Sequence, residues 1–326
     1  MHLTPLKVFE NLKEKKIDKA SAEKFLITFV EEAEIEKDRL ESLYYLKELG
    51  VKSVDFFKLL ENILVSDSNP QMRAYAAELI RELFCEKALI PMKWAIQHES
   101  DLDCLVSIIR GIVQMNNKIA RLILLQEIKK LKRRDFIDDA RDYSNIPFQK
   151  SLNACIRRKR IKKLSLNALG EILINYHTIK YLIETLYTIF FEWDEGCITQ
   201  LDLSEIGWNV NVWRSKYAER LRDLSEIKCL SYLSRLKKLD LSHNKLSNIK
   251  DLTPFKELTE LNLCYNHLDK VENIEYLKQL PNLKRLDISG NEIAKYLKKE
   301  DLPGIHVVRY HGLKPRFETT YMINRI

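Results

Sequence analysis

The sequence predicts an α solenoid of paired helical repeats followed by an α/β solenoid with a short parallel sheet. Three observations carry this prediction. A short sequence motif recurs in the last third of the chain, at residues 239–244, 261–266 and 286–291, with spacings of 22 and 25 residues. Amphipathic segments recur in the first half at intervals of about 34 residues. Gly and Pro number only 8 each in 326 residues, and this scarcity favours helices over tight turns.

Capping residues and apolar spacing predict the helices of the first half. Residues 73–83 are amphipathic and follow the stretch DSNP at 67–70, in which Asp, Ser or Asn can cap a helix and Pro suits its first turn. Residues 39–49 carry an aligned Arg and the same Lys/Arg-Glu-Leu ending, 34 residues earlier. Residues 105–112 follow another acidic cap region, and residues 54–64 form a helix between these segments. An irregular helical bundle is the alternative to a solenoid.

Residues 165–193 predict a further long helix or helix pair, because apolar residues recur there at three- and four-residue steps. The stretch WDEG at 193–196 then breaks this pattern. We therefore expect a domain boundary at this point. The expected domains are residues 1–195, which are helical, and residues 196–326, which contain the strand repeats.

Each copy of the recurring motif alternates apolar and polar residues and ends in Asn. The alternation predicts a short strand whose apolar side chains point into the core. The Asn amide can satisfy backbone groups that the following turn leaves without partners. Leu239, Leu261 and Leu286 should therefore lie above one another in a shared parallel sheet. Residues 201–204 predict an earlier, degenerate strand in which Ile206 takes the place of the Asn.

Because of these motifs, residues 224–310 resemble the short, 22-residue class of leucine-rich repeat found in the regulatory subunit of protein phosphatase 1. Residues 291–296 and the Leu-Pro pair at 302–303 are similar to the C-terminal cap of that family. In the first half, residues 69–77 (NPQMRAYAA) give a resemblance to HEAT-type repeats. The resemblance implies the fold and no particular partner, because such repeats serve many unrelated proteins.

Repeat stacks build surfaces that hold other molecules, so the leading prediction is a non-catalytic protein-protein interaction scaffold or adaptor. The protein partner, of unknown identity, would lie on the curved inner faces. The side chains expected on the concave strand face are Gln200, Asp202, Lys237, Lys238, Asp240, Ser242, His243, Glu260, Asn262, Tyr265, Arg285 and Asp287. Tyr265 is the expected energetic anchor, because aromatic residues dominate binding hot spots. Trp208 and Trp213 are a second candidate, with packing at the domain junction as the alternative.

The charge of the chain is concentrated in one stretch. The formal net charge is +7, and residues 118–163 alone carry +10 (15 Lys or Arg against 5 Asp or Glu). The alternative prediction is therefore binding of nucleic acid, an acidic protein or another polyanion in this region. The residues concerned are Lys129, Lys130, Lys132, Arg133, Arg134, Arg157, Arg158, Lys159, Arg160, Lys162 and Lys163. A solvated helix surface explains the same charges.

No pattern in the sequence predicts chemistry. The two nearest glycines, Gly304 and Gly312, are eight residues apart, which excludes a Gly-rich phosphate loop. His243 and His267 fit solvated edge positions better than a metal site. The polar column at residues 202, 240, 262 and 287 fits partner binding or solvation better than acid–base catalysis. We therefore expect no enzyme activity, no cofactor, no metal and no small-molecule substrate.

The sequence also predicts a compartment. No apolar secretory segment follows the first Met, and no apolar stretch is long enough to span a membrane. The six Cys residues are scattered, without a Cys-x-x-Cys pair. This pattern predicts a reducing, cytoplasmic setting.

Overall fold

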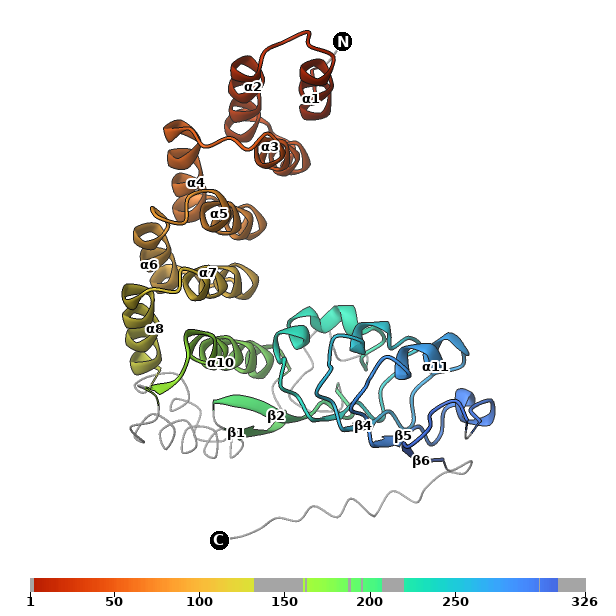
Figure 1. Ribbon diagram of the computed structural model, residues 1–326. Helices are drawn as coiled ribbons and strands as arrows, with labels where there is room; N and C mark the ends of the chain where they lie inside the picture. The colour runs from red at the N-terminus through yellow and green to blue at the C-terminus, as the bar shows by residue number, and fades with distance from the viewer. Residues whose placement is uncertain are drawn as a thin grey trace. The chain divides into compact units, whose positions relative to one another are not determined.

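The computed structural model describes residues 3–131, 161, 163–186, 189–194, 196–206, 220–298 and 300–309 (Figure 1). The chain divides into two compact units. One unit contains Met1–Leu131 and Leu164–Leu173, and the other contains Lys132–Lys163 and Ile174–Ile326. The domain boundary expected at residue 195 stays a prediction.

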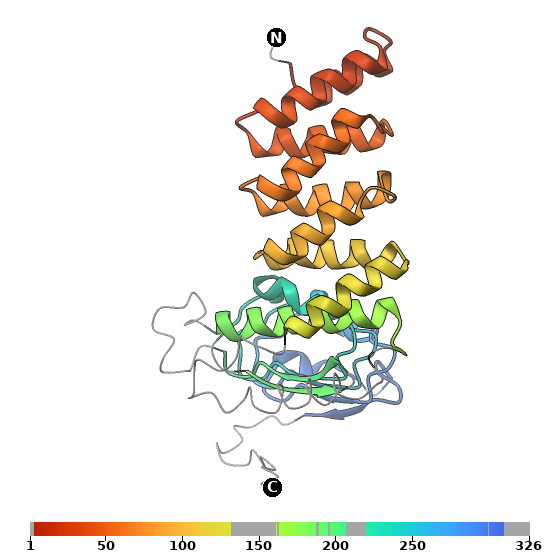
Figure 2. The same cartoon turned by 90° about the vertical axis from the view of Figure 1, so that its left-hand side faces the viewer.

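The helical unit is built from eight successive helices and the start of a later one. Their bounds are α1 Pro5–Lys13, α2 Lys19–Glu32, α3 Glu36–Glu48, α4 Val54–Ser66, α5 Pro70–Leu83, α6 Leu89–His98, α7 Leu102–Gln114 and α8 Lys118–Lys130. The helices alternate between two layers, with α2, α4, α6 and α8 in one layer and α1, α3, α5 and α7 in the other (Figures 1 and 2). This alternation confirms helical repeats in the first half of the chain.

The predicted caps form. The Asn69 side-chain oxygen accepts the backbone N–H groups of Gln71 and Met72 at the start of α5, at 2.8 and 3.4 Å. The Asp101 carboxylate accepts the backbone N–H of Cys104 at the start of α7, at 2.9 Å. These bonds satisfy N–H groups that the first helical turn leaves without partners.

Helix α10, Leu166–Leu186, begins in the helical unit. Its Gly170 lies against α7, where a Cβ atom would come within 2.4 Å of the Val113 Cγ2. Only glycine therefore allows this close approach between the two helices.

Six strands form one sheet in the order β1 to β6. Their bounds are β1 Phe190–Asp194, β2 Cys197–Asp202, β3 Lys238–Asp240, β4 Glu260–Asn262, β5 Arg285–Asp287 and β6 His306–Val308. The pairings from β2 to β6 are parallel, and Leu239, Leu261 and Leu286 are opposite one another. All three leucines are at most 2% exposed, which confirms the predicted stack of strands.

The other side of this core is covered by short helical segments. They are η2 Leu224–Tyr232, η3 Lys250–Leu252, α11 Glu272–Leu277 and η4 Glu292–Lys295. Apolar residues behind the strands, such as Leu246, Ile249 and Phe255, are at most 2% exposed. Each repeat thus buries one strand face and one helical face in a continuous core.

The prediction of helix for residues 190–193 is wrong. Helix α10 ends at Leu186, and residues 190–194 form β1, which pairs antiparallel with β2. The stretch Phe190-Phe-Glu-Trp is rich in aromatic residues, which favour strands. Pairing with β2 overrides the apolar spacing that continued from the helix.

Candidate functional site on the strand face

The first outward position of the strands forms a row of polar side chains across the sheet. The register sets Gln200, Lys238, Glu260 and Arg285 opposite one another on β2 to β5. The Lys238 Nζ lies 3.0 Å from the Glu260 Oε1, and the Gln200 amide donates to the carboxylate of Glu192 on β1. From β3 to β5 the row therefore alternates basic and acidic groups, and the neutral Gln200 precedes them on β2.

The second outward position forms the polar column expected from the sequence. Its four members accept a backbone N–H two residues ahead: Asp202 from Ser204 (2.8 Å), Asp240 from Ser242 (2.8 Å), Asn262 from Cys264 (3.1 Å) and Asp287 from Ser289 (2.9 Å). These side chains therefore shape the turn that ends each strand. The column recurs because every repeat needs that turn.

Asp240 is the most constrained member of this column. Burial raises its pKa and the nearby Asp202 carboxylate adds to this effect, whereas hydrogen bonds from Ser242 and Asn262 oppose it. The Asn262 amide donates to the second carboxylate oxygen of Asp240 at 2.8 Å. On balance the pKa of Asp240 is raised, so this site favours the protonated, neutral form of its carboxyl group more than water does.

The recurring asparagines form a buried ladder beneath the turns. The Asn266 amide donates to the carbonyls of Leu241 and Leu263 at 2.9 and 3.0 Å, and its oxygen accepts the N–H of Leu246 at 3.0 Å. Asn291 makes the same set of bonds one repeat further on. The predicted role of these amides is confirmed, and the bonds join each repeat to its predecessor.

The first member of the ladder is incomplete. Asn244 donates to Leu203 and Leu241 at 2.9 and 3.0 Å, but its oxygen has no partner within the described ranges. The corresponding backbone N–H would come two residues after Ile206, outside the residues that the structure describes. Asn244 is only 1% exposed, and among the described residues it makes fewer bonds than Asn266, which is 4% exposed.

The residue before each Asn, and before Ile206 in the degenerate repeat, adopts a left-handed backbone. Glu205, His243, Tyr265 and Gly290 have φ of 52°, 57°, 52° and 72° at this position in four successive repeats. The His243 and Tyr265 rings stack with centroids 4.6 Å apart, and the His243 Nδ1 lies 3.7 Å from the Glu205 carboxylate. A Cβ on Gly290 would lie 2.5 Å from the Tyr265 Cδ1, so the tyrosine ring covers the glycine. We call these four residues the rim row.

Sequence reasoning missed the backbone conformation of the rim row. Non-glycine residues rarely adopt positive φ, and three of the four members are not glycine. Gly290 was the available signal, because it occupies the place that His243 and Tyr265 hold in the preceding repeats.

The expected concave-face residues differ in exposure. Lys237, Lys238 and Arg285 are exposed. The half-buried members are Gln200, Asp202, Asp240, His243, Glu260, Asn262, Tyr265 and Asp287. The expectation that Ser242 presents its side chain is wrong, because it is only 4% exposed. Ser242 lies within the turn after the strand, and its counterparts Cys264 and Ser289 are also buried.

Most of the predicted polyanion site lies outside the described residues. Lys132, Arg133, Arg134, Arg157, Arg158, Lys159, Arg160 and Lys162 lie outside the described residues, as do Trp208 and Trp213. Lys129, Lys130 and Lys163 are described and exposed. The Lys130 Nζ is 2.7 Å from the Glu127 carboxylate, so part of its charge is neutralised within α8. The polyanion hypothesis stays a prediction.

Within the described ranges, no group of three or more His, Cys, Asp or Glu residues could hold a metal ion. Burial raises the pKa of the Cys264 thiol to about 12, which disfavours the nucleophilic thiolate at neutral pH. No helix among the described residues has the length and apolarity needed to cross a membrane. The cytoplasmic location stays a prediction.

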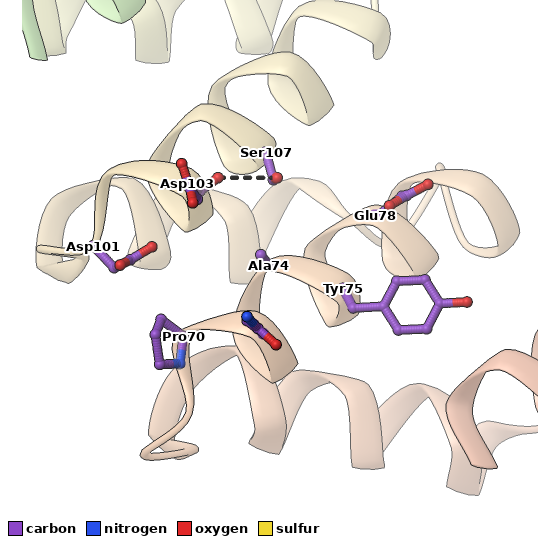
Figure 3. A pocket seen from close by; sticks show the side chains of 8 residues that line it. Pro70, Ala74, Tyr75, Glu78, Asp101, Asp103 and Ser107 are labelled. Atoms are coloured by element: carbon purple, nitrogen blue, oxygen red, sulfur yellow. Dashed lines mark hydrogen bonds between the residues drawn. The ribbon is translucent and has the colours of Figure 1, made fainter. Parts of the chain in front are cut away.

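A shallow pocket of about 380 Å³ lies between α5 and α7 in the helical unit (Figure 3). It is lined by Pro70, Gln71, Ala74, Tyr75, Glu78, Asp101, Asp103 and Ser107. The Ser107 hydroxyl donates to the Asp103 carbonyl at 3.1 Å, and Asp101 caps α7. The Ser107 hydroxyl thus donates to a backbone carbonyl, which is not the general base that an activated nucleophile needs.

Comparison with known families identifies the strand repeats. Residues 235–255 match the family described as Leucine Rich Repeat, and residues 256–303 match Leucine Rich repeats (2 copies). A comparison with curated proteins finds no match. Repeats of this kind generally serve as non-catalytic modules for protein–protein interaction. Residues 235–303 of this chain are therefore leucine-rich repeats.

Proposed function

We propose that this protein is a non-catalytic scaffold or adaptor that holds a protein partner on the strand face of β2 to β5. The observation that carries the proposal is the register of the strands. It aligns Lys238, Glu260 and Arg285 in one row, with the second polar column beside it. A partner that lies across the strands can contact equivalent side chains of several repeats at once.

The rim row supplies an anchor beside this surface. Tyr265 is half-buried, and its ring is held between the His243 ring and the Gly290 backbone. A side chain that is already fixed loses little conformational entropy when a partner binds. Aromatic residues in such positions often dominate interface energies. Tyr265 therefore remains the proposed anchor, and Arg285, an exposed member of the first row, is the proposed charged contact.

The test begins with capture of the partner from the native host by the full chain, followed by mass spectrometry. The affinity of the purified partner is then measured for the wild type and for Tyr265→Ala and Arg285→Glu. Lys250→Glu is the matched control, because Lys250 is an exposed basic residue on η3, which covers the opposite side of the core. We expect a loss of about tenfold or more for both strand-face variants and little change for the control. Equal affinities for all four proteins would refute the proposal.

We further propose the finer family assignments. The helical unit is HEAT-like, which is supported by its two alternating layers and by the 34-residue interval between Arg39 and Arg73. The leucine-rich repeats are of the short class, similar to those of the protein phosphatase 1 regulatory subunit. The 22-residue interval between Leu239 and Leu261 supports this assignment.

A further inference from the structure

The layer formed by α2, α4, α6 and α8 changes its surface chemistry along the helical unit. Exposed acidic residues occur on α2 and α4, among them Glu31, Glu32 and Asp55. Helix α6 contains no Asp or Glu. The single acidic residue of α8 is Glu127, which is 8% exposed and 2.7 Å from the Lys130 Nζ. Helices α6 and α8 therefore expose no carboxylate.

The same two helices expose large apolar side chains. Ile90 and Trp94 on α6 are 80% and 42% exposed, and Ile119 and Leu122 on α8 are 55% and 57% exposed. Exposed lysines accompany them, Lys93 on α6 and Lys118 on α8. We call this set of residues the α6–α8 face. Its defining members are Ile90, Lys93, Trp94, Lys118, Ile119 and Leu122.

The members of this face lie at matching levels. Helices α6 and α8 run in the same direction, because α7 returns the chain between them through two short loops. They lie next to each other in Figures 1 and 2, and the Gln97 amide donates to the Glu127 carboxylate at 3.2 Å. Trp94 and Leu122 therefore lie roughly one turn before this bond, and Ile90 and Ile119 roughly two turns before it. The exposed apolar side chains thus occur at similar heights on two adjacent helices, and we call these four side chains the apolar strip.

The Trp94 ring is also held in place. It stacks on the His98 ring with centroids 4.1 Å apart, and the His98 Nδ1 is 2.8 Å from the Trp94 carbonyl oxygen. The ring is thereby directed along the helix. A ring that is already fixed loses little conformational entropy when a partner packs against it.

We infer that the α6–α8 face is a docking surface for an acidic amphipathic helix of a protein partner. The apolar strip receives the apolar side of such a helix, with Trp94 as the anchor. Lys93 and Lys118 face its acidic residues, and the lack of exposed carboxylates removes like-charge repulsion. The surface belongs to the helical unit and is independent of the strand face, so the protein has two docking sites of different chemistry.

The test uses the full chain and a labelled synthetic helical peptide of Leu, Ala and Glu, followed by fluorescence anisotropy. We expect binding that weakens with salt, and much weaker binding of the same peptide with Lys in place of Glu. Lys93→Glu and Ile90→Ser should each weaken binding by about tenfold. The matched controls Lys58→Glu and Val54→Ser, which change exposed residues of α4, should leave binding unchanged.

Several results would overturn the inference. They are no binding of the acidic peptide, equal binding of the basic peptide, or equal losses for the α6 variants and their α4 controls. Vesicles of phosphatidylcholine and phosphatidylserine provide a further arm. Binding to these vesicles without binding to the acidic peptide would assign the face to a membrane surface instead. All the substituted residues are exposed, and circular dichroism verifies that each variant folds.

Discussion

The helical unit and the leucine-rich repeats both stack short modules, but they join neighbouring modules with different chemistry. The helical unit uses ion pairs between an Arg near the start of one helix and an acidic residue in a later loop. Arg39 pairs with Asp67, and Arg73 pairs with Glu99. The two arginines are 34 residues apart, and the two acidic residues are 32 residues apart. The leucine-rich repeats use neutral amides, Asn266 and Asn291, that bond to backbone groups. The Arg73–Glu99 ion pair should therefore respond to acid, because the pKa of Glu99 is lowered, whereas the neutral amides carry no titrating group.

The Arg73–Glu99 ion pair keeps a buried carboxylate charged between successive helical repeats. Its guanidinium donates two bonds to the Glu99 carboxylate, at 2.8 and 2.9 Å, and a third to the Asp67 carbonyl, at 2.7 Å. The Glu99 side chain is only 5% exposed. Burial alone would raise its pKa, but bonds from Arg73, Cys104 and the Asp101 backbone outweigh burial and set the pKa to about 2. The folded unit thus strongly favours the charged form of Glu99.

The largest loss of stability is expected when Asn266, which bonds to its own repeat and to the preceding one, is removed. Asn266→Ala removes an amide that bonds to three backbone groups and leaves them buried, so we expect a loss of about 4 kcal/mol in the free energy of unfolding. Asn244→Ala should cost about 1 kcal/mol less, because the Asn244 oxygen has no partner within the described ranges. Urea unfolding of both variants measures the difference. Equal losses would show that the bond to Leu246 contributes nothing.

Breaking the Arg73–Glu99 ion pair should lower the free energy of unfolding by nearly as much. Arg73→Met leaves the Glu99 carboxylate buried without its cation, and we expect a loss of about 3 kcal/mol. Adding Glu99→Gln should recover part of this loss, since the buried charge is then gone. A double-mutant cycle from urea unfolding measures the coupling. Additive losses would mean that the two side chains do not stabilise each other.

The rim row should show a smaller effect. Gly290→Ala should cost about 2 kcal/mol, because the new Cβ meets the Tyr265 ring and the backbone is left-handed. Gly50→Ala is the matched control. Gly50 has a φ of 60° and nothing within 4 Å of the added Cβ, so only the backbone cost of about 1 kcal/mol remains. Thermal unfolding of Gly290→Ala, with and without Tyr265→Ala, separates the clash from the backbone cost. If Gly290→Ala costs as much without the Tyr265 ring as with it, the predicted clash is wrong.

The sequence was sufficient to predict features that depend on local spacing. The stack of Leu239, Leu261 and Leu286 follows from a pattern repeated within each module, and the cap at Asn69 follows from the residues next to it. Strand β1 was missed because its conformation depends on pairing with β2. The burial of Ser242 was missed because strand alternation does not continue into the turn. The left-handed rim row depends on a backbone conformation that three of its four side chains do not favour.

The opposite pKa directions of Glu99 and Asp240 give the most direct test of the comparison. The pKa of Glu99 is lowered from its ordinary value of 4.5 to about 2, so its stabilising contribution is complete above pH 4.5 and is lost as the pH falls toward 2. The pKa of Asp240 is raised, so its protonation in acid favours the folded state, and this contribution is lost as the pH rises. Acid should therefore weaken the helical unit at the joint between α5 and α7 and spare the sheet.

The decisive measurement is hydrogen exchange of the full chain at about pH 6 and about pH 3, corrected for intrinsic exchange rates. We predict that α5 and α7 lose about 2 kcal/mol of protection at the lower pH, since one pKa unit corresponds to about 1.4 kcal/mol. Strands β3 and β4 should keep their protection, and Glu99→Gln should make the helical unit much less sensitive to pH. Equal loss of protection in the sheet and in the helices, or loss confined to the sheet, would contradict the account.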